Sequence, residues 1–174
     1  MTSMEAIMRV SSLCRLLPWV FAAAAAMPAG AEVSVSFSHP ERYTDVGRLD
    51  WNADLALQTI EEHLKQLGER HLLPGRTLEV EVLDIDLAGR PEPRPGRAQD
   101  VRVVRGTTDW PSIKLRYTLK AGDRVLESNE ESITDKNYFL RPRRYVGSEH
   151  LRYEKQMLDD WFKARFGGER QAPH

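Results

Sequence analysis

The sequence predicts a single small α+β domain, in which a mostly antiparallel sheet of four to five strands carries two helices on one face. Two observations lead to this fold class. Several segments alternate apolar and polar residues with a period of two, and two others place apolar residues at helical spacing. Their order along the chain, strand, helix, three further strands and helix, is typical of α+β layers.

The first strand and the first helix have clear boundaries. Apolar residues alternate with serines from Val33 to Ser38, and His39-Pro40 ends that strand. From about Trp51 to Leu67 an apolar stripe predicts a helix, with Asp50 or Asn52 as N-cap and Gly68 as the C-terminal stop. The stripe consists of Leu57, Ile60, Leu64 and Leu67.

The segment Thr77–Leu87 predicts a long strand whose apolar face changes phase. Leu78, Val80 and Val82 share one side, and the apolar set then moves to Leu83, Ile85 and Leu87. A bulge near Val82-Leu83, or departure of the strand from the core, accounts for the change. Three prolines and two glycines in residues 88–99 predict an irregular loop.

The second half predicts a hairpin and a final helix. A short strand is expected near residues 101–104, followed by an alternating strand over 113–119. Gly122-Asp123 is a two-residue turn into a strand over 124–133, which gives an antiparallel hairpin with one wet face. Ser148 is expected to cap a last helix that ends at Gly167-Gly168. Its inward side chains are Leu151, Met157, Leu158, Trp161 and Phe162.

The first 31 residues have the features of a Sec-type signal peptide. Arg9 and Arg15 form a basic n-region, an apolar run follows, and Ala29-Gly30-Ala31 suits signal peptidase. Cys14 is the only cysteine and precedes the apolar run, so lipidation is disfavoured and the mature chain contains no thiol. We expect a periplasmic or secreted protein with one domain over 32–168 and a flexible tail over 169–174.

Charge and length exclude several classes of protein. The 174 residues contain 25 basic and 26 acidic side chains, a balance that disfavours a general nucleic-acid binder. The apolar run of the signal is too short to span a bilayer, and no later stretch approaches the length required.

Three segments resemble the domain of unknown function 3016 family, a group of uncharacterised exported bacterial proteins. They are LEVEVLDIDLAG (78–89), DWPSIKLRYT (109–118) and LRYEKQMLDDWF (151–162). The resemblance extends over nearly the whole mature chain, from the VSVSF strand to the last helix. It implies export, and no catalytic residue carries over from it.

Asp84 and Asp86 are the sharpest candidates for chemistry. Two carboxylates at i and i+2 on one strand face lie about 7 Å apart, a spacing that suits a hard cation such as Ca²⁺ or an acid–base pair. The alternative is that they pair with Arg90 or Arg102, or cap backbone amides. Neither the scattered histidines nor the serines form a recognisable zinc or nucleophile motif.

Two basic loops are candidates for binding anions. One contains Arg90, Arg94, Arg97, Arg102 and Arg105, and the other contains Arg141, Arg143 and Arg144. Guanidinium groups suit phosphate, acidic polysaccharide or lipid headgroups, although nearby carboxylates can neutralise them. Trp110 and Tyr138-Phe139 either form an exposed contact patch or close the core.

Together these features favour a non-enzymatic envelope module that binds another envelope protein or an anionic envelope component. Its recognition surface is expected at the open hairpin and the arginine-rich loops, with Asp84, Asp86, Arg90, Arg102, Trp110, Arg141, Arg143 and Arg144 as candidate binding residues. No cofactor is indicated. The alternative is a small periplasmic metal-dependent hydrolase that uses Asp84 and Asp86. A third reading is a purely structural or stress-related protein without a ligand.

Overall fold

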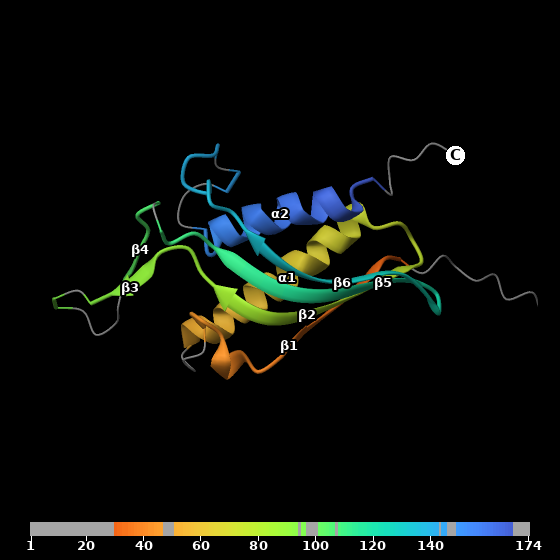
Figure 1. The fold of residues 1–174 in the computed structure, drawn as a ribbon, viewed down its shortest axis with the longest axis horizontal. Helices are drawn as coiled ribbons and strands as arrows, with labels where there is room; N and C mark the ends of the chain where they lie inside the picture. The colour runs from red at the N-terminus through yellow and green to blue at the C-terminus, as the bar shows by residue number, and fades with distance from the viewer. Residues whose placement is uncertain are drawn as a thin grey trace, which may run out of the picture.

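The computed structural model describes residues 30–46, 51–93, 95–96, 101–106, 108–142, 144–145 and 149–168. The main sheet has the strand order β1 (Glu32–Phe37), β2 (Arg76–Asp86), β5 (Ser112–Ala121), β6 (Arg124–Thr134). Helices α1 (Trp51–His71) and α2 (Arg152–Phe166) both lie on one side of this sheet, as Figure 1 shows. The α+β class predicted from the sequence is confirmed.

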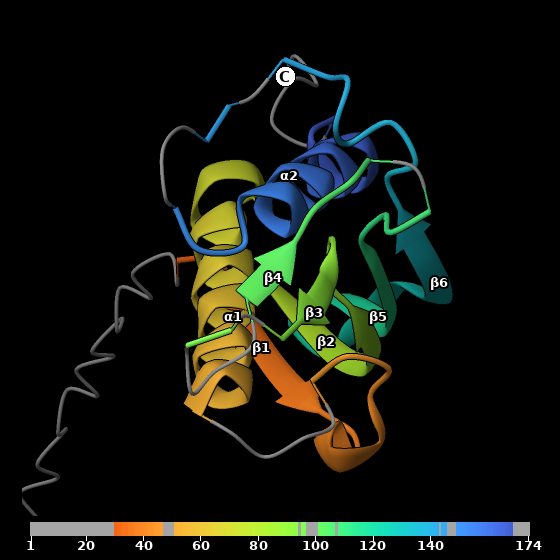
Figure 2. The ribbon, with the colours of Figure 1, turned by 90° about the vertical axis from the view of Figure 1, so that its left-hand side faces the viewer.

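The sheet is mixed. Strand β1 pairs with β2 in parallel, with α1 as the crossover between them, whereas β2–β5 and β5–β6 are antiparallel. A short 3-10 helix, η1 (Pro40–Arg42), follows β1. Figure 2 shows α1 beside β1, and α2 further toward β6. The helices therefore cover one face from edge to edge, and no helix of the described residues covers the other face.

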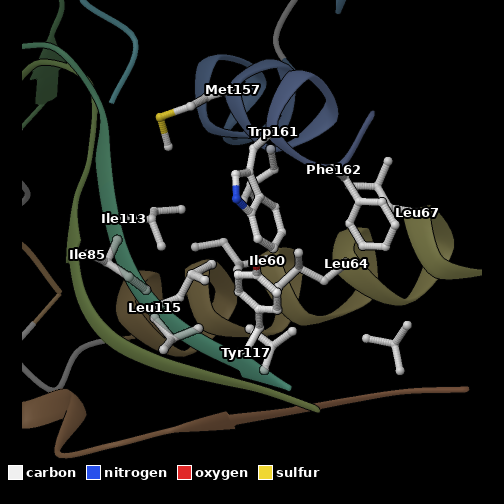
Figure 3. Close-up of a cluster of buried hydrophobic side chains, with 14 of the residues drawn as sticks. Ile60, Leu64, Leu67, Ile85, Ile113, Leu115, Tyr117, Met157, Trp161 and Phe162 are labelled. Carbon is white, nitrogen blue, oxygen red and sulfur yellow. The ribbon is translucent and has the colours of Figure 1, made fainter. Parts of the chain in front are cut away.

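The core lies between that covered face and the two helices. Alternate residues of β2 and β5, such as Val80 and Leu115, are at most 4% exposed and meet apolar residues of both helices. Figure 3 shows Tyr117 of β5 beneath Ile60 of α1 and Trp161 of α2. The Tyr117 and Trp161 rings pack edge to face with centroids 5.7 Å apart.

The phase change in β2 is a bulge. The pairing register with β5 shifts between Val82 and Asp84, so that Leu83 is the extra residue. The bulge brings Val82 and Ile85 to the same face, where both are fully buried. Asp84 and Asp86 consequently lie on the opposite, helix-free face.

Gly68 does not end the first helix, which continues to His71. A Cβ atom on Gly68 would lie only 2.1 Å from Cγ2 of Val33 in β1. The glycine therefore allows α1 to approach β1 closely, and its helix-stop interpretation from the sequence is wrong.

Two further expectations need correction or fall outside the structure. Part of the loop over 88–99 forms strand β3 (Arg90–Glu92), which pairs with β4 (Val101–Val103) in a separate ribbon at one end of the main sheet (Figure 1). Ser148 and Asp50 lie outside the described residues. Helix α2 begins at Arg152, and Leu151, at φ 54°, occupies the N-cap position.

Candidate functional site

The helix-free face of the sheet is a continuous polar surface, which we call the open face. It is built from the residues of each strand that alternate with the core residues. Its charged and hydroxyl-bearing members on the described strands are Glu32, Ser34, Ser36, Thr77, Glu79, Glu81, Asp84, Asp86, Ser112, Lys114, Arg116, Thr118, Lys120, Ser128, Glu130, Ser132 and Thr134. The carboxylates in this set outnumber the lysine and arginine side chains, so the open face is acidic.

Ion pairs across the strands tie down the cations of the open face. Arg116 bridges Glu81 and Glu130, with N–O distances of 2.8 Å to each. Lys114 also contacts Glu130 at 2.8 Å, and these two cations lower the pKa of the Glu130 carboxyl. The positive charges are thus satisfied within the sheet, and solvent-exposed pairs of this kind contribute little to stability.

A shallow depression of about 360 Å³ lies on the open face over β1, β2 and β5. Its lining combines the hydroxyl and charged side chains of Ser34, Ser36, Glu79, Glu81, Arg116 and Thr118 with Val35, Val80 and Tyr117. Such a shallow surface offers hydrogen bonds and charge, and it does not enclose a small molecule in the way that a ligand pocket does.

Strand β6 forms one border of the open face and one edge of the sheet. Among the described residues it pairs with β5 alone. Val125 and Leu126, at the start of the strand, are 53% and 38% exposed. The hairpin predicted from the sequence is present, with Gly122 in the left-handed region at φ 57° as its turn requires.

The helix-facing side of β6 also carries carboxylates. Glu131 accepts hydrogen bonds from the Trp161 indole at 3.0 Å and forms an ion pair with Arg165 at 2.6 Å. Glu127 accepts a hydrogen bond from the Tyr117 hydroxyl at 2.5 Å. Burial and these acidic neighbours raise the pKa of Tyr117, so the phenol keeps its proton and acts as the donor. This cluster was not predictable from the sequence, because a glutamate on a core-facing position gives no local signal of its partners.

Asp84 is engaged in a local structural role. Its two carboxylate oxygens accept hydrogen bonds from the Thr44 backbone amide at 2.7 Å and the Thr44 hydroxyl at 2.8 Å. These bonds attach the segment after η1 to the end of β2. The arrangement matches the amide-capping alternative considered for Asp84.

Asp86 lies in an acidic environment beside an arginine. Burial raises the pKa of Asp86, and the nearby Asp45 and Asp84 raise it further, while Arg102 opposes them. Arg102 itself pairs with Asp45 at 2.6 Å. Within the described segments, no group of three His, Cys, Asp or Glu side chains is arranged to hold a metal ion.

A second acidic group missed by the sequence analysis lies nearby. The Glu154 carboxyl of α2 is 2% exposed and accepts a hydrogen bond from the Ala88 amide at 2.7 Å. Its burial raises its pKa. The group attaches α2 to the chain that leaves β2, and an isolated glutamate in a helix does not reveal such a contact.

Four of the five candidate arginines that the structure describes have carboxylate partners within the chain. Arg105 pairs with Glu92, and Arg144 pairs with Asp160 at 2.7 Å. Arg141 contacts both Asp135 and Asp160. Arg90 is exposed on β3, while Arg94, Arg97 and Arg143 lie outside the described residues. Guanidinium groups engaged in this way are less available to an external phosphate.

The aromatic candidates separate into buried and exposed groups. Tyr138 is 3% exposed and donates a hydrogen bond to Asp109 at 2.8 Å, and Trp110 is half-buried against the same small cluster. Phe139 and Leu140, in contrast, are 40% and 84% exposed. Tyr138 and Trp110 therefore mainly close a satellite core, and the exposed apolar pair is Phe139-Leu140.

The fold and the open face define a small α+β domain with a mixed four-stranded sheet covered on one side. The chain belongs to the family described as "Protein of unknown function (DUF3016)", which matches residues 31–164. The resemblance seen in the sequence is thereby confirmed. No curated protein and no solved structure matches the chain significantly. No helix of the described part combines the length and apolar character needed to cross a bilayer.

Proposed function

We propose that this chain is an exported, non-catalytic binding module that recognises a partner protein through the open face and the β5–β6 hairpin. The observation that carries the proposal is the asymmetry of the sheet. Both helices pack on one face, while the other face and the β6 edge present polar, hydrogen-bonding groups to solvent. A sheet with one face that no described helix covers suits recognition of a macromolecular surface.

The charge of this surface favours a protein partner over an anionic envelope component. The open face is acidic, and its cations Lys114, Arg116 and Lys120 are already paired with glutamates. Arg102 and Arg141 of the basic loops also have internal partners. A partner with basic side chains is therefore electrostatically complementary, whereas a phosphate-rich partner is not.

Site-specific photocrosslinking in the native cell tests the proposal. A photoreactive amino acid replaces Ser128 on the open face, and in a matched control it replaces Lys65 on the exposed side of α1. We expect a discrete crosslinked adduct from Ser128 that is absent from Lys65. No adduct from Ser128, or the same adduct from both positions, would contradict recognition by this face.

Export is supported by the basic n-region, the apolar run and the small residues before Glu32. Cell fractionation combined with intact-mass analysis tests it. We expect a periplasmic or secreted species that has lost residues 1–31. A cytoplasmic protein that retains these residues would show that the export prediction is wrong.

A further inference from the structure

The outer edge of β6 presents a regular row of backbone amides. The Glu130 amide donates a hydrogen bond to the side-chain oxygen of its neighbour Asn129 at 2.9 Å, so it does not point into the ladder with β5. The Asp135 amide, five residues later and thus of opposite parity, donates to the Pro111 carbonyl on the β5 side. Because successive amides alternate in direction, those of Ser128 and Ser132 point outward with that of Glu130.

Over residues 128–132 this edge contains no proline, no lysine and no bulge. Natural sheets protect an edge with proline, lysine, a bulge or a short strand. Strand β6 has 11 residues and contains neither proline nor lysine, and its register shift lies near the turn, opposite Leu119 and Lys120. The inward Glu127 and Glu131 already have partners from the helix-facing side. Both carboxylates would therefore keep their partners if a further strand paired with this edge.

The charges of β6 discriminate between possible partners. The strand carries three glutamates and one arginine. A second copy of the chain, paired antiparallel about the centre of the outward row, would place Glu130 opposite Glu130. Like charges directly opposite one another in a sheet are destabilising, whereas a lysine or arginine at that place is favourable.

We propose that β6 binds an extended segment of a partner protein as an added strand of the sheet, with lysine or arginine on the side chains that face Glu130. The backbone row supplies the hydrogen bonds, and the exposed Val125 and Leu126 supply apolar contacts at one end. This inference rests on the proposed function and specifies how the same surface binds.

The test uses a displayed library of random ten-residue peptides, selected against the purified full chain. A peptide enriched by the selection is then titrated against the variants Ser132→Pro and Ser132→Ala. Proline removes an outward amide and leaves the β5 ladder intact, whereas alanine keeps that amide. We expect enriched peptides rich in lysine or arginine, about tenfold weaker binding to the proline variant, and unchanged binding to the alanine variant.

A second measurement needs no variant and remains informative if Ser132→Pro fails to fold. Amide hydrogen exchange of the wild-type protein is compared with and without the peptide. We expect new protection at Ser128 and Ser132, while Asn129 and Glu131 are protected in both states. Glu130 is not used as a reporter, because its amide already donates to Asn129 in the free chain. Absence of enrichment, equal binding to both variants, or protection elsewhere would overturn strand addition.

The two proposals fail in different ways. If a photoreactive residue at Ser128 captures the same partner in cells with equal yield in the Ser132→Pro and Ser132→Ala backgrounds, the open face binds a protein without strand addition. If Ser128 captures no partner in any background, the proposed function itself fails.

Discussion

Replacement of Gly68 by alanine tests how closely α1 approaches β1. In an exposed helix interior, Gly→Ala stabilises a protein by about 1 kcal/mol. Here the new Cβ would lie 2.1 Å from the Val33 Cγ2 atom, a separation that real Cβ atoms do not adopt. Overpacking of this kind costs about 1–3 kcal/mol, because α1 or β1 must shift. We therefore expect a net destabilisation of up to about 2 kcal/mol, or a fall in Tm of up to roughly 8 °C.

A double-mutant cycle with Val33→Ala isolates the clash. Removal of the two valine methyl groups opens the space that the new Cβ needs, so Gly68→Ala is expected to become neutral or stabilising in that background. Thermal and urea unfolding of the wild type, both single variants and the double variant provide the four free energies. Additive effects of the two substitutions, or stabilisation by Gly68→Ala alone, would refute the packing argument.

Two further predictions concern the acidic groups. Burial raises the pKa of Glu154 above its ordinary 4.5, so the folded protein binds a proton that the unfolded chain releases. The stability that this proton confers is therefore lost as the pH rises above about 4.5. Glutamine at position 154 stays neutral at every pH. In urea unfolding we expect Glu154→Gln to be more stable than the wild type at pH 7 and equally stable near pH 3. A constant difference across this range would contradict burial of the carboxyl. Both carboxylate oxygens of Asp84 already accept hydrogen bonds from Thr44. We therefore expect the thermal unfolding temperature to stay unchanged when Ca²⁺, Mg²⁺, Mn²⁺ or Zn²⁺ is added. A rise that disappears in the Asp84→Asn, Asp86→Asn variant would favour the metal-dependent hydrolase.

The hairpin was predictable because its signals are local, whereas the bulge was one of two alternatives that the sequence left open. Alternation from Ile113 to Leu119 and the Gly122-Asp123 turn specify an antiparallel pair without information from elsewhere in the chain. The change of apolar phase at Leu83 allowed either a bulge or departure of the strand from the core, and the pairing of β2 with β5 shows that it is a bulge.

The strand β3 and the role of Gly68 were not predictable in the same way. Arg90–Glu92 contains a proline and pairs with β4 across an intervening loop, so its pairing depends on a distant segment. Gly68 matches a helix-stop pattern, and only the position of Val33 on a neighbouring strand shows why a glycine is needed there.

The candidate site shows the same division. The sequence correctly placed Asp84 and Asp86 on one strand face, but it did not reveal that Thr44 occupies the first or that Arg102 pairs with Asp45. Ion pairs form between residues tens of positions apart, and their choice among many carboxylates depends on distances that only the folded chain defines.

The sequence by itself determined the α+β class, the family, the hairpin and the polar alternation of the strands, because each depends on neighbouring residues and on fixed backbone periodicities. Only the tertiary structure decided the strand order, the parallel pairing of β1 with β2 and the position of β6 at an edge. These features depend on which faces bury apolar area together. Since burial is a non-directional and long-range property of the whole chain, no local pattern encodes it.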